Sequence, residues 1–139
     1  MFSGLFQSTT IPVLQEVVNF SQIRHTVLAG NIANLDTPGY QVRDLSLEDF
    51  QERLQAAIKE RRQPPAPIYR SPGEPEVEKS LPLADVSKSP KSILYHDKSN
   101  VGLEYQVTEM VKNQLQHNTA LSIMRSQFRL LQAAISGKT

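Results

Sequence analysis

The sequence predicts an all-α protein in which two long antiparallel helices, one at each end of the chain, form a coiled-coil-like pair. A short helix and an irregular, proline-rich segment are expected between them. Two observations support this fold class: apolar residues recur every three or four positions near both ends of the 139-residue chain, and seven of the nine prolines lie between residues 64 and 90. The predicted regions are an N-terminal segment and long helix (1–35), a turn, short helix and linker (36–100), and a C-terminal long helix (101–139).

The first long helix is predicted over residues 11–35. Pro12 suits its first turn, where a missing N–H group costs no hydrogen bond, and Thr10 is a candidate N-cap. One stripe of this helix alternates steps of three and four residues, the spacing of a helix that packs along another helix. The stripe consists of Leu14, Val18, Ser21, His25, Leu28, Ile32 and Leu35. Further apolar residues are expected to widen it: Val13, Val17, Phe20 and Val27.

The second long helix is predicted from residue 101 to about Ser136, where Gly137 can adopt the left-handed conformation that commonly ends a helix. Its stripe keeps the same alternation of steps along the whole helix. A stripe this long and regular favours packing against other helices over a small globular fold. It consists of Leu103, Val107, Met110, Gln114, His117, Leu121, Met124, Phe128, Leu131 and Ile135.

Both stripes carry polar residues near their middle. In an antiparallel pair Leu35 would lie near Leu103 and Leu14 near Phe128, which brings the two polar regions to the same level. Polar residues inside a helix interface cost stability but fix the register of the helices. We therefore expect one polar layer, made by Ser21, His25, Gln114 and His117.

A sharp turn is predicted directly after the first helix. Pro38 ends the helix, because a proline disfavours helical geometry at the residue before it, here Thr37. Pro38 and Gly39 suit the two central positions of a type II turn, the second of which requires a positive φ. Tyr40 then leaves the turn as a large side chain. The turn is expected to send the chain away from the first helix so that the last helix can return along it.

A short helix is predicted over residues 47–62. Ser46 and Asp49 have the spacing of a capping box, in which each side chain bonds the backbone N–H of the other residue. After this helix the dense proline predicts extended chain, with short strands at most near residues 68–69 and 93–95. A proline-rich ligand for an adaptor domain is the alternative, but the segment has no convincing P-x-x-P site beside a basic residue.

Composition and spacing argue against catalysis and nucleic-acid binding. The net charge is only +1, and the chain has no cysteine for a disulfide, a thiolate nucleophile or a metal site. The run from His96 to Ser99 lacks the glycine-flanked elbow of a serine hydrolase, and the histidines lie far apart in sequence. No apolar run is long enough to span a membrane, and the first ten residues lack the features of a cleaved signal peptide. We expect no enzyme activity, cofactor, metal, nucleic-acid partner or direct membrane insertion.

The run from Asn31 to Tyr40 resembles the A-N-I-A-N-x-x-T-P-G-Y signature of bacterial flagellar axial proteins, the rod and hook subunits. The run from Asn100 to Glu104, with the apolar residues after it, is similar to the matching C-terminal end of those proteins. The short chain and the order of its features resemble the basal-body rod family rather than the hook protein. The residues assigned to the motif and its turn are Asn31, Ile32, Ala33, Asn34, Asp36, Thr37, Pro38, Gly39 and Tyr40.

This resemblance implies a structural subunit that polymerises helically, through its N- and C-terminal helices, at the proximal end of the flagellar rod. Such subunits are exported by the flagellar type III apparatus without a cleaved signal, into a rod that crosses the periplasm and transmits torque from the membrane ring to the hook. The implied partners are further copies of the chain, other rod subunits, the membrane-ring protein and its rod adaptor, and the export gate. Phe2 and Phe6 are a candidate export signal. The residues expected to carry assembly are Leu14, Val18, Leu28, Ile32, Leu35, Leu103, Val107, Met110, Leu121, Met124, Phe128, Leu131 and Ile135.

A second hypothesis is a small helical adaptor or export-chaperone-like module whose exposed stripes bind a helix of another protein. An adaptor of this kind should fold cooperatively alone, whereas a filament subunit needs separate faces for several neighbours. A highly helical, cooperatively melting monomer in circular dichroism would favour the adaptor.

Overall fold

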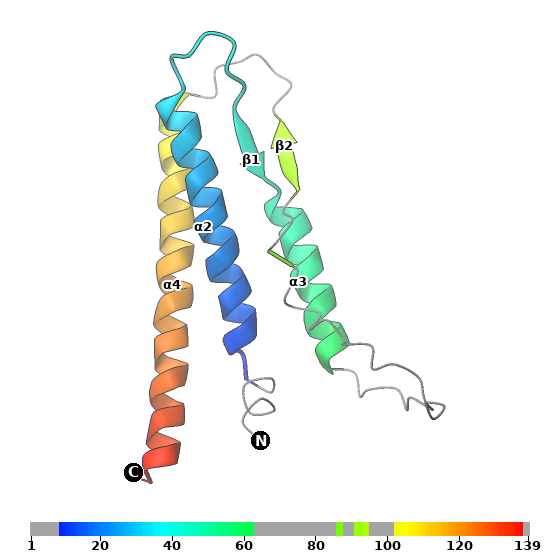
Figure 1. The fold of residues 1–139 in the computed structure, drawn as a ribbon, viewed down its shortest axis with the longest axis vertical. Helices are drawn as coiled ribbons and strands as arrows, with labels where there is room; N and C mark the ends of the chain where they lie inside the picture. The colour runs from blue at the N-terminus through cyan, green and yellow to red at the C-terminus, as the bar shows by residue number, and fades with distance from the viewer. Residues whose placement is uncertain (1–8, 63–85, 88–90, 95–101, 138–139) are drawn as a thin grey trace, which may run out of the picture.

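A computed structural model describes residues 9–62, 86–87, 91–94 and 102–137 of the chain (Figure 1). This part of the protein is mainly α-helical, as the sequence predicts. Its elements in chain order are helix α2 (Ile11–Ala33), strand β1 (Arg43–Leu45), helix α3 (Leu47–Arg62), strand β2 (Ser92–Leu94) and helix α4 (Leu103–Ser136). Most of the proline-rich segment, the expected strand at residues 68–69, and Phe2 and Phe6 lie outside the described residues.

The two long helices lie side by side and run in opposite directions, with α2 between α4 and the unit formed by α3 and the two strands (Figure 1). Hydrogen bonds between the helices fix this orientation: Asn31, near the end of α2, meets Gln106 near the start of α4, and Ser21 meets His117 farther along. The antiparallel arrangement agrees with the prediction, while the coiled-coil character of the pair stays a prediction.

Local signals determine where the helices end. Helix α2 ends at Ala33, two residues before the predicted Leu35. The backbone N–H of Tyr40 donates to the Thr37 carbonyl over 3.1 Å, and Gly39 has a φ of 77°, which confirms the predicted type II turn. At the other end of the chain Gly137 has a φ of 63° and ends α4, as predicted.

The two strands refine the all-α prediction: β1 is not expected from the sequence, whereas β2 overlaps the short strand expected near residues 93–95. Strands β1 and β2 pair antiparallel, with Arg43 opposite Leu94 and Leu45 opposite Ser92. The pairing also changes the predicted capping box. Ser46 Oγ accepts from the Asp49 N–H over 3.1 Å as predicted, but the Ser46 N–H donates to the Lys91 carbonyl over 2.8 Å. The second half of the box is therefore wrong, because the strand connection already uses that N–H group.

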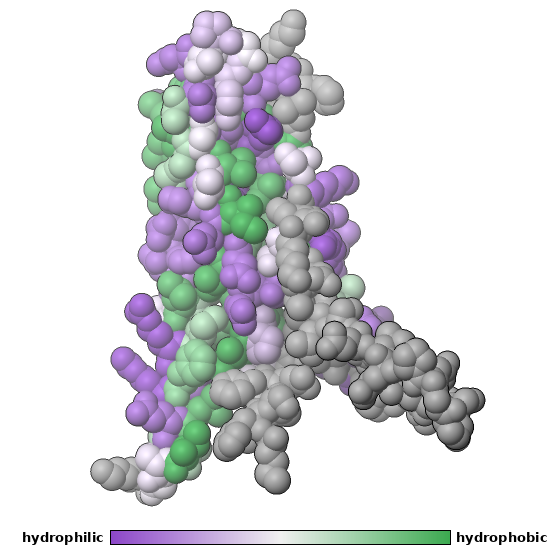
Figure 2. All heavy atoms as spheres, in the orientation of Figure 1, coloured by the Kyte–Doolittle hydropathy of each residue, from purple (hydrophilic) through white to green (hydrophobic). Residues whose placement is uncertain are grey.

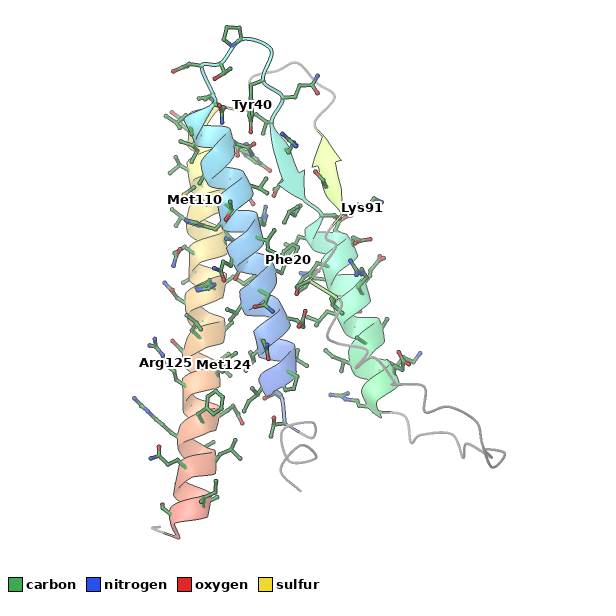
Figure 3. All side chains as sticks on the ribbon, viewed as in Figure 1. Phe20, Tyr40, Lys91, Met110, Met124 and Arg125 are labelled. Carbon is green, nitrogen blue, oxygen red and sulfur yellow. The ribbon has the colours of Figure 1, made fainter. Side chains whose placement is uncertain are left out.

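A small apolar core lies between α2 and α3. The rings of Phe20 and Phe50 stack there with their centroids 4.0 Å apart, and Figure 3 shows Phe20 on the side of α2 that faces α3. The buried members of this core are Phe20, Leu45, Phe50, Ala57 and Val86, with Val13, Val17, Val27, Leu47 and Leu54 packed against them. The prediction that Val13, Val17, Phe20 and Val27 widen the stripe facing α4 is wrong, because all four belong to the core toward α3. They form a second apolar face of α2, so this helix packs on two sides.

Helix α4 buries a different face from the predicted stripe. Its buried residues are Gln106, Asn113 and Ala120, whereas Leu103, Phe128 and Ile135 from the stripe are exposed. In Figure 2 apolar side chains accordingly appear on the side of the molecule where α4 lies, separated by polar ones. The predicted stripe therefore lies only partly inside the helix pair, and much of the apolar surface of α4 faces outward.

Candidate functional site

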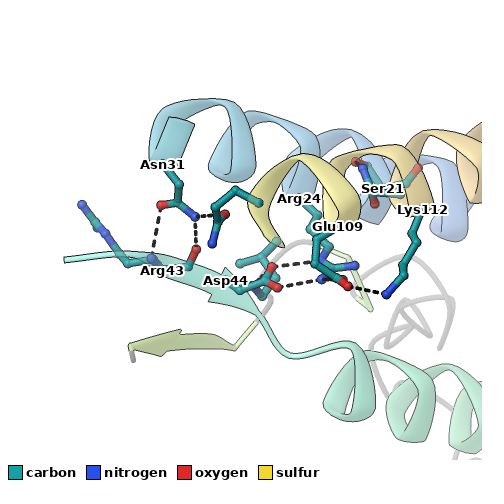
Figure 4. A network of polar contacts seen from close by, with 10 residues as sticks. Ser21, Arg24, Asn31, Arg43, Asp44, Glu109 and Lys112 are labelled. Carbon is teal, nitrogen blue, oxygen red and sulfur yellow. Dashed lines mark hydrogen bonds and ion pairs between the residues drawn. The ribbon is translucent and has the colours of Figure 1, made fainter. Parts of the chain in front are cut away.

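Asn31 is the centre of the turn motif. Its side chain is fully buried and bonds three different parts of the chain. The amide nitrogen Nδ2 donates to the Arg43 carbonyl and, over 3.1 Å, to Gln106 Oε1 on α4. The oxygen Oδ1 accepts from Tyr40 Oη over 3.1 Å and from the Arg43 N–H over 3.2 Å (Figure 4 shows the bonds to Arg43). One amide thus connects α2, the residue after the turn, strand β1 and α4.

The second asparagine of the motif has a local role. Asn34 Nδ2 donates over 2.9 Å to the carbonyl of Gly30, one turn earlier in the same helix, and its backbone N–H bonds the same carbonyl. These bonds close the end of α2 before the turn. The motif therefore combines a helix end, a turn of fixed geometry and a long-range connection through Asn31. Figure 3 shows Tyr40 returning toward the end of α2.

A buried ionic network lies two turns before Asn31. Arg24 Nε and Nη2 donate to the two carboxylate oxygens of Asp44 over 2.9 and 2.6 Å, and Nη2 also donates to Glu109 Oε2 over 2.9 Å. Lys112 Nζ donates to the other Glu109 oxygen over 2.7 Å (Figure 4). The guanidinium therefore joins α2, β1 and α4 with the bidentate geometry that arginine offers to carboxylates.

The contacts within this network stabilise the charged forms of Arg24 and Glu109. Hydrogen bonding to Asp44 raises the pKa of Arg24, against the opposing effect of burial. The hydrogen bond from Lys112 lowers the pKa of Glu109 below its usual 4.5, with a further contribution from Arg24, although burial acts in the opposite direction. Because the folded pKa of Glu109 is depressed, its ionised form stabilises the fold above pH 4.5, and this contribution is lost as the pH falls through the folded pKa.

The stability of the protein is therefore expected to fall on acidification in a manner that depends on Glu109. Urea unfolding of the wild type should give a lower free energy of unfolding at about pH 3.5 than at pH 7. Glu109→Gln keeps the shape of the side chain but does not titrate, so its stability should depend less steeply on pH over this range. Equal pH dependence in the two proteins would contradict the assignment.

The four residues of the predicted polar layer line one cleft between α2 and α4. The cleft has a volume of about 240 Å³ and is lined by Ser21, Gln22, His25, Asn113, Gln114 and His117. Ser21 Oγ lies 2.8 Å from His117 Nδ1. Asn113 Nδ2 donates to the Ser21 carbonyl over 2.7 Å. The helix register thus brings these polar residues together, while their part in assembly remains a prediction.

Several residues of the site were not identified from the sequence. Arg24, Asp44 and Glu109 were not singled out, and neither was Gln106 or the side-chain role of Asn113. One signal was available: Arg24 occupies the apolar face of its helix, four residues after Phe20 and four before Leu28, where a charged side chain needs a buried partner. The identity of that partner could not be predicted, because Glu109 lies 85 residues away in sequence.

Within the described ranges no three His, Cys, Asp or Glu side chains are grouped so that they could hold a metal ion. In the same ranges, none of the helices α2, α3 and α4 is long and apolar enough to cross a membrane.

The comparisons with known proteins all point to the same family. Residues 19–41, which cover the second half of α2 and the turn, match the model of the family described as "Flagella basal body rod protein". The flagellar basal body rod protein FlgB of Aquifex aeolicus is 30% identical over 128 residues, which are 92% of this chain and 94% of the relative. FlgB of Salmonella typhimurium is 28% identical over 88% of this chain and 90% of the relative, and FlgB of Bacillus subtilis is 21% identical over 99% and 97%. The chain therefore belongs to the flagellar basal body rod protein family.

Proposed function

We propose that this chain is a structural subunit of the bacterial flagellar rod, which polymerises helically at the proximal end of the rod and transmits torque from the membrane ring to the hook. The observation that carries the proposal is the similarity to FlgB proteins along nearly the whole chain, from α2 to α4. A structural subunit acts through its surfaces, so the faces of the two long helices are the parts that perform the function.

The exposed apolar surface of α4 supports assembly through this helix. Within the described residues, all but two of the exposed large apolar side chains lie on it: Leu103, Tyr105, Val107, Val111, Leu115, Ile123, Phe128, Leu130 and Ile135. So many exposed large apolar side chains along one helix support contacts between α4 and neighbouring proteins. We assign Leu103, Val107, Phe128 and Ile135 to contacts with neighbouring subunits. Met124 and Leu131, from the same stripe, are only partly buried.

The proposed partners are further copies of this chain, other rod subunits, the membrane-ring protein with its rod adaptor, and the type III export gate. In this proposal the chain reaches the rod without a cleaved signal peptide, and Phe2 and Phe6 act in recognition by the export gate. The chain acts by assembly and carries no catalytic step.

Purified basal bodies test the proposal. A strain that lacks the gene for this chain should build no rod and should not swim, and a tagged full-length copy should restore both. Electron cryo-microscopy of the restored basal bodies should show density for α2 and α4 in the wall of the proximal rod. A chain that stays in the cytoplasm with an export substrate, and is absent from the basal body, would identify an adaptor instead.

The turn after α2 gives a direct mutational test. Gly39→Val places a β-branched residue at a φ of 77°, which costs about 1–2 kcal/mol in backbone strain and misdirects the chain toward Tyr40. We expect loss of rod assembly and of swimming in soft agar. An added Cβ at Gly39 meets no atom of the described structure within 4 Å, so within the subunit the strain comes from the backbone conformation. Gly39→Asn, which tolerates this conformation, is the matched control. Normal swimming of the valine variant would show that the rod does not need the turn.

A further inference from the structure

We propose that the polar cleft between α2 and α4 receives a side chain with N–H donors, an amide or a guanidinium, from a neighbouring rod subunit. This inference rests on the proposed function and specifies one contact within it. The cleft lies between the two long helices, and two of its lining residues, Gln22 and Gln114, are exposed, so it is open to a neighbour. Its buried atoms define the chemistry of the group that can enter.

Asn113 provides an acceptor without a partner. Its side chain is 2% exposed, and Nδ2 is held by the Ser21 carbonyl at 2.7 Å. This bond fixes the orientation of the amide, so the lone pairs belong to Oδ1. Oδ1 is buried and has no hydrogen-bond partner in the described structure. A buried acceptor left unpaired costs free energy, which a donor from outside would recover.

The two histidines of the cleft provide further ring nitrogens for hydrogen bonding. Ser21 Oγ has one proton and lies 2.8 Å from both the Val18 carbonyl and His117 Nδ1. Because a carbonyl only accepts, the proton of Ser21 goes to Val18, and His117 Nδ1 donates to Ser21 Oγ. Neutral His117 then keeps an unprotonated Nε2. Nδ1 of His25 is also buried without a partner among the described residues.

The side chains that line the cleft favour a group with N–H donors over a carboxylate. No carboxylate, lysine or arginine lines the cleft, and among the described residues neither Gln22 nor Gln114, whose amides also line it, donates to Asn113 Oδ1. A carboxylate from a neighbour would face the Asn113 oxygen and be repelled. An amide or guanidinium group can donate to Asn113 Oδ1 and, with a second N–H, to an imidazole nitrogen. The volume of about 240 Å³ accommodates such a group.

Asn113→Leu tests the inference, because leucine has a similar shape and removes the acceptor. The full-length variant should melt close to the temperature of the wild type, since the loss of the Asn113 Nδ2 bond to the Ser21 carbonyl is offset by the removal of a buried unpaired oxygen. Its incorporation into basal bodies, measured by quantitative blotting in a strain that lacks the native copy, should fall about tenfold. Ser122→Leu is the matched control, because Ser122 is exposed on the same helix and, in the described structure, neither lines the cleft nor bonds a residue that does. This control should incorporate normally.

Gln22→Trp provides a second test that does not alter buried residues. Gln22 is exposed, so the variant should fold, while the indole occupies the cleft and excludes a neighbour. Reduced incorporation of both cleft variants, with unchanged melting of the tryptophan variant, supports the inference. Normal incorporation of both would overturn it and indicate a cleft that is merely hydrated. If the leucine variant unfolds, the tryptophan variant decides alone. Absence of the wild-type chain from basal bodies would overturn the proposed function and this contact together.

Discussion

Arg24→Met is expected to lower the free energy of unfolding by about 3–5 kcal/mol, the largest effect of any substitution considered for this chain. Arg24 is 6% exposed and bonds both Asp44 and Glu109. Methionine keeps much of the volume of the side chain but leaves the two carboxylates without their shared partner. Asp44 is itself buried, so its charge would remain largely uncompensated. Urea unfolding at pH 7, followed by circular dichroism, measures the loss.

Arg53→Met is the matched control for this prediction. Arg53 forms an ion pair with Asp49 over 3.9 Å on the surface of α3, where both side chains are about one-third exposed. Exposed pairs contribute about 0–1 kcal/mol, so the loss of this ion pair should lower the free energy of unfolding far less than the loss of the Arg24 network. Arg24→Met combined with Asp44→Leu should recover part of the lost stability, because it removes a stranded charge together with its partner. Similar stability of the Arg24 and Arg53 variants would contradict a buried network.

Asn31→Ala is expected to lower the free energy of unfolding by about 3 kcal/mol, through the loss of several buried hydrogen bonds. The side chain is 0% exposed, so water cannot replace it at Gln106 or at the N–H and carbonyl groups of Arg43. Helix α4 and strand β1 would both lose their connection to α2 at this level. Thermal melting of the full chain should therefore shift to a lower temperature.

Asn34→Ala is the appropriate comparison, because the two residues share one motif and one amide chemistry. Among the residues that the structure describes, the Asn34 side chain bonds only the Gly30 carbonyl of its own helix, which the Asn34 backbone N–H also bonds. We expect this substitution to cost about 0.5–1 kcal/mol, the usual net value of a hydrogen bond. An Asn34 variant as unstable as the Asn31 variant would mean that the motif acts only through the end of the helix.

The sequence predicts those parts of the fold that depend on neighbouring residues. The bounds of α3 agree with the prediction because Ser46 marks its start and a proline pair follows its end. The turn agrees because Pro38 and Gly39 alone determine its φ angles. In these places a few adjacent side chains select the backbone conformation, so reading the chain locally is sufficient.

The remainder depends on contacts between distant residues. Strands β1 and β2 have three residues each, too few for an alternating pattern, and they are almost 50 residues apart. The buried face of α4 could not be predicted from apolar spacing, because Gln106 and Asn113 turn inward to bond Asn31 and Ser21 of α2. Heptad spacing indicates that a helix packs against another helix. It does not distinguish a partner helix in the same chain from one in a neighbouring subunit.

The polar character of the contact between α2 and α4 has a thermodynamic consequence. Helices that meet through Asn31, Gln106, Arg24 and Asn113 bury less apolar surface than an ordinary helix pair, and α4 keeps much of its own apolar surface outside. The heat-capacity change of unfolding arises mainly from newly exposed apolar surface. A single subunit should therefore unfold with a small heat-capacity change for its size. The larger apolar heat-capacity change should accompany the association of subunits, where that surface leaves water.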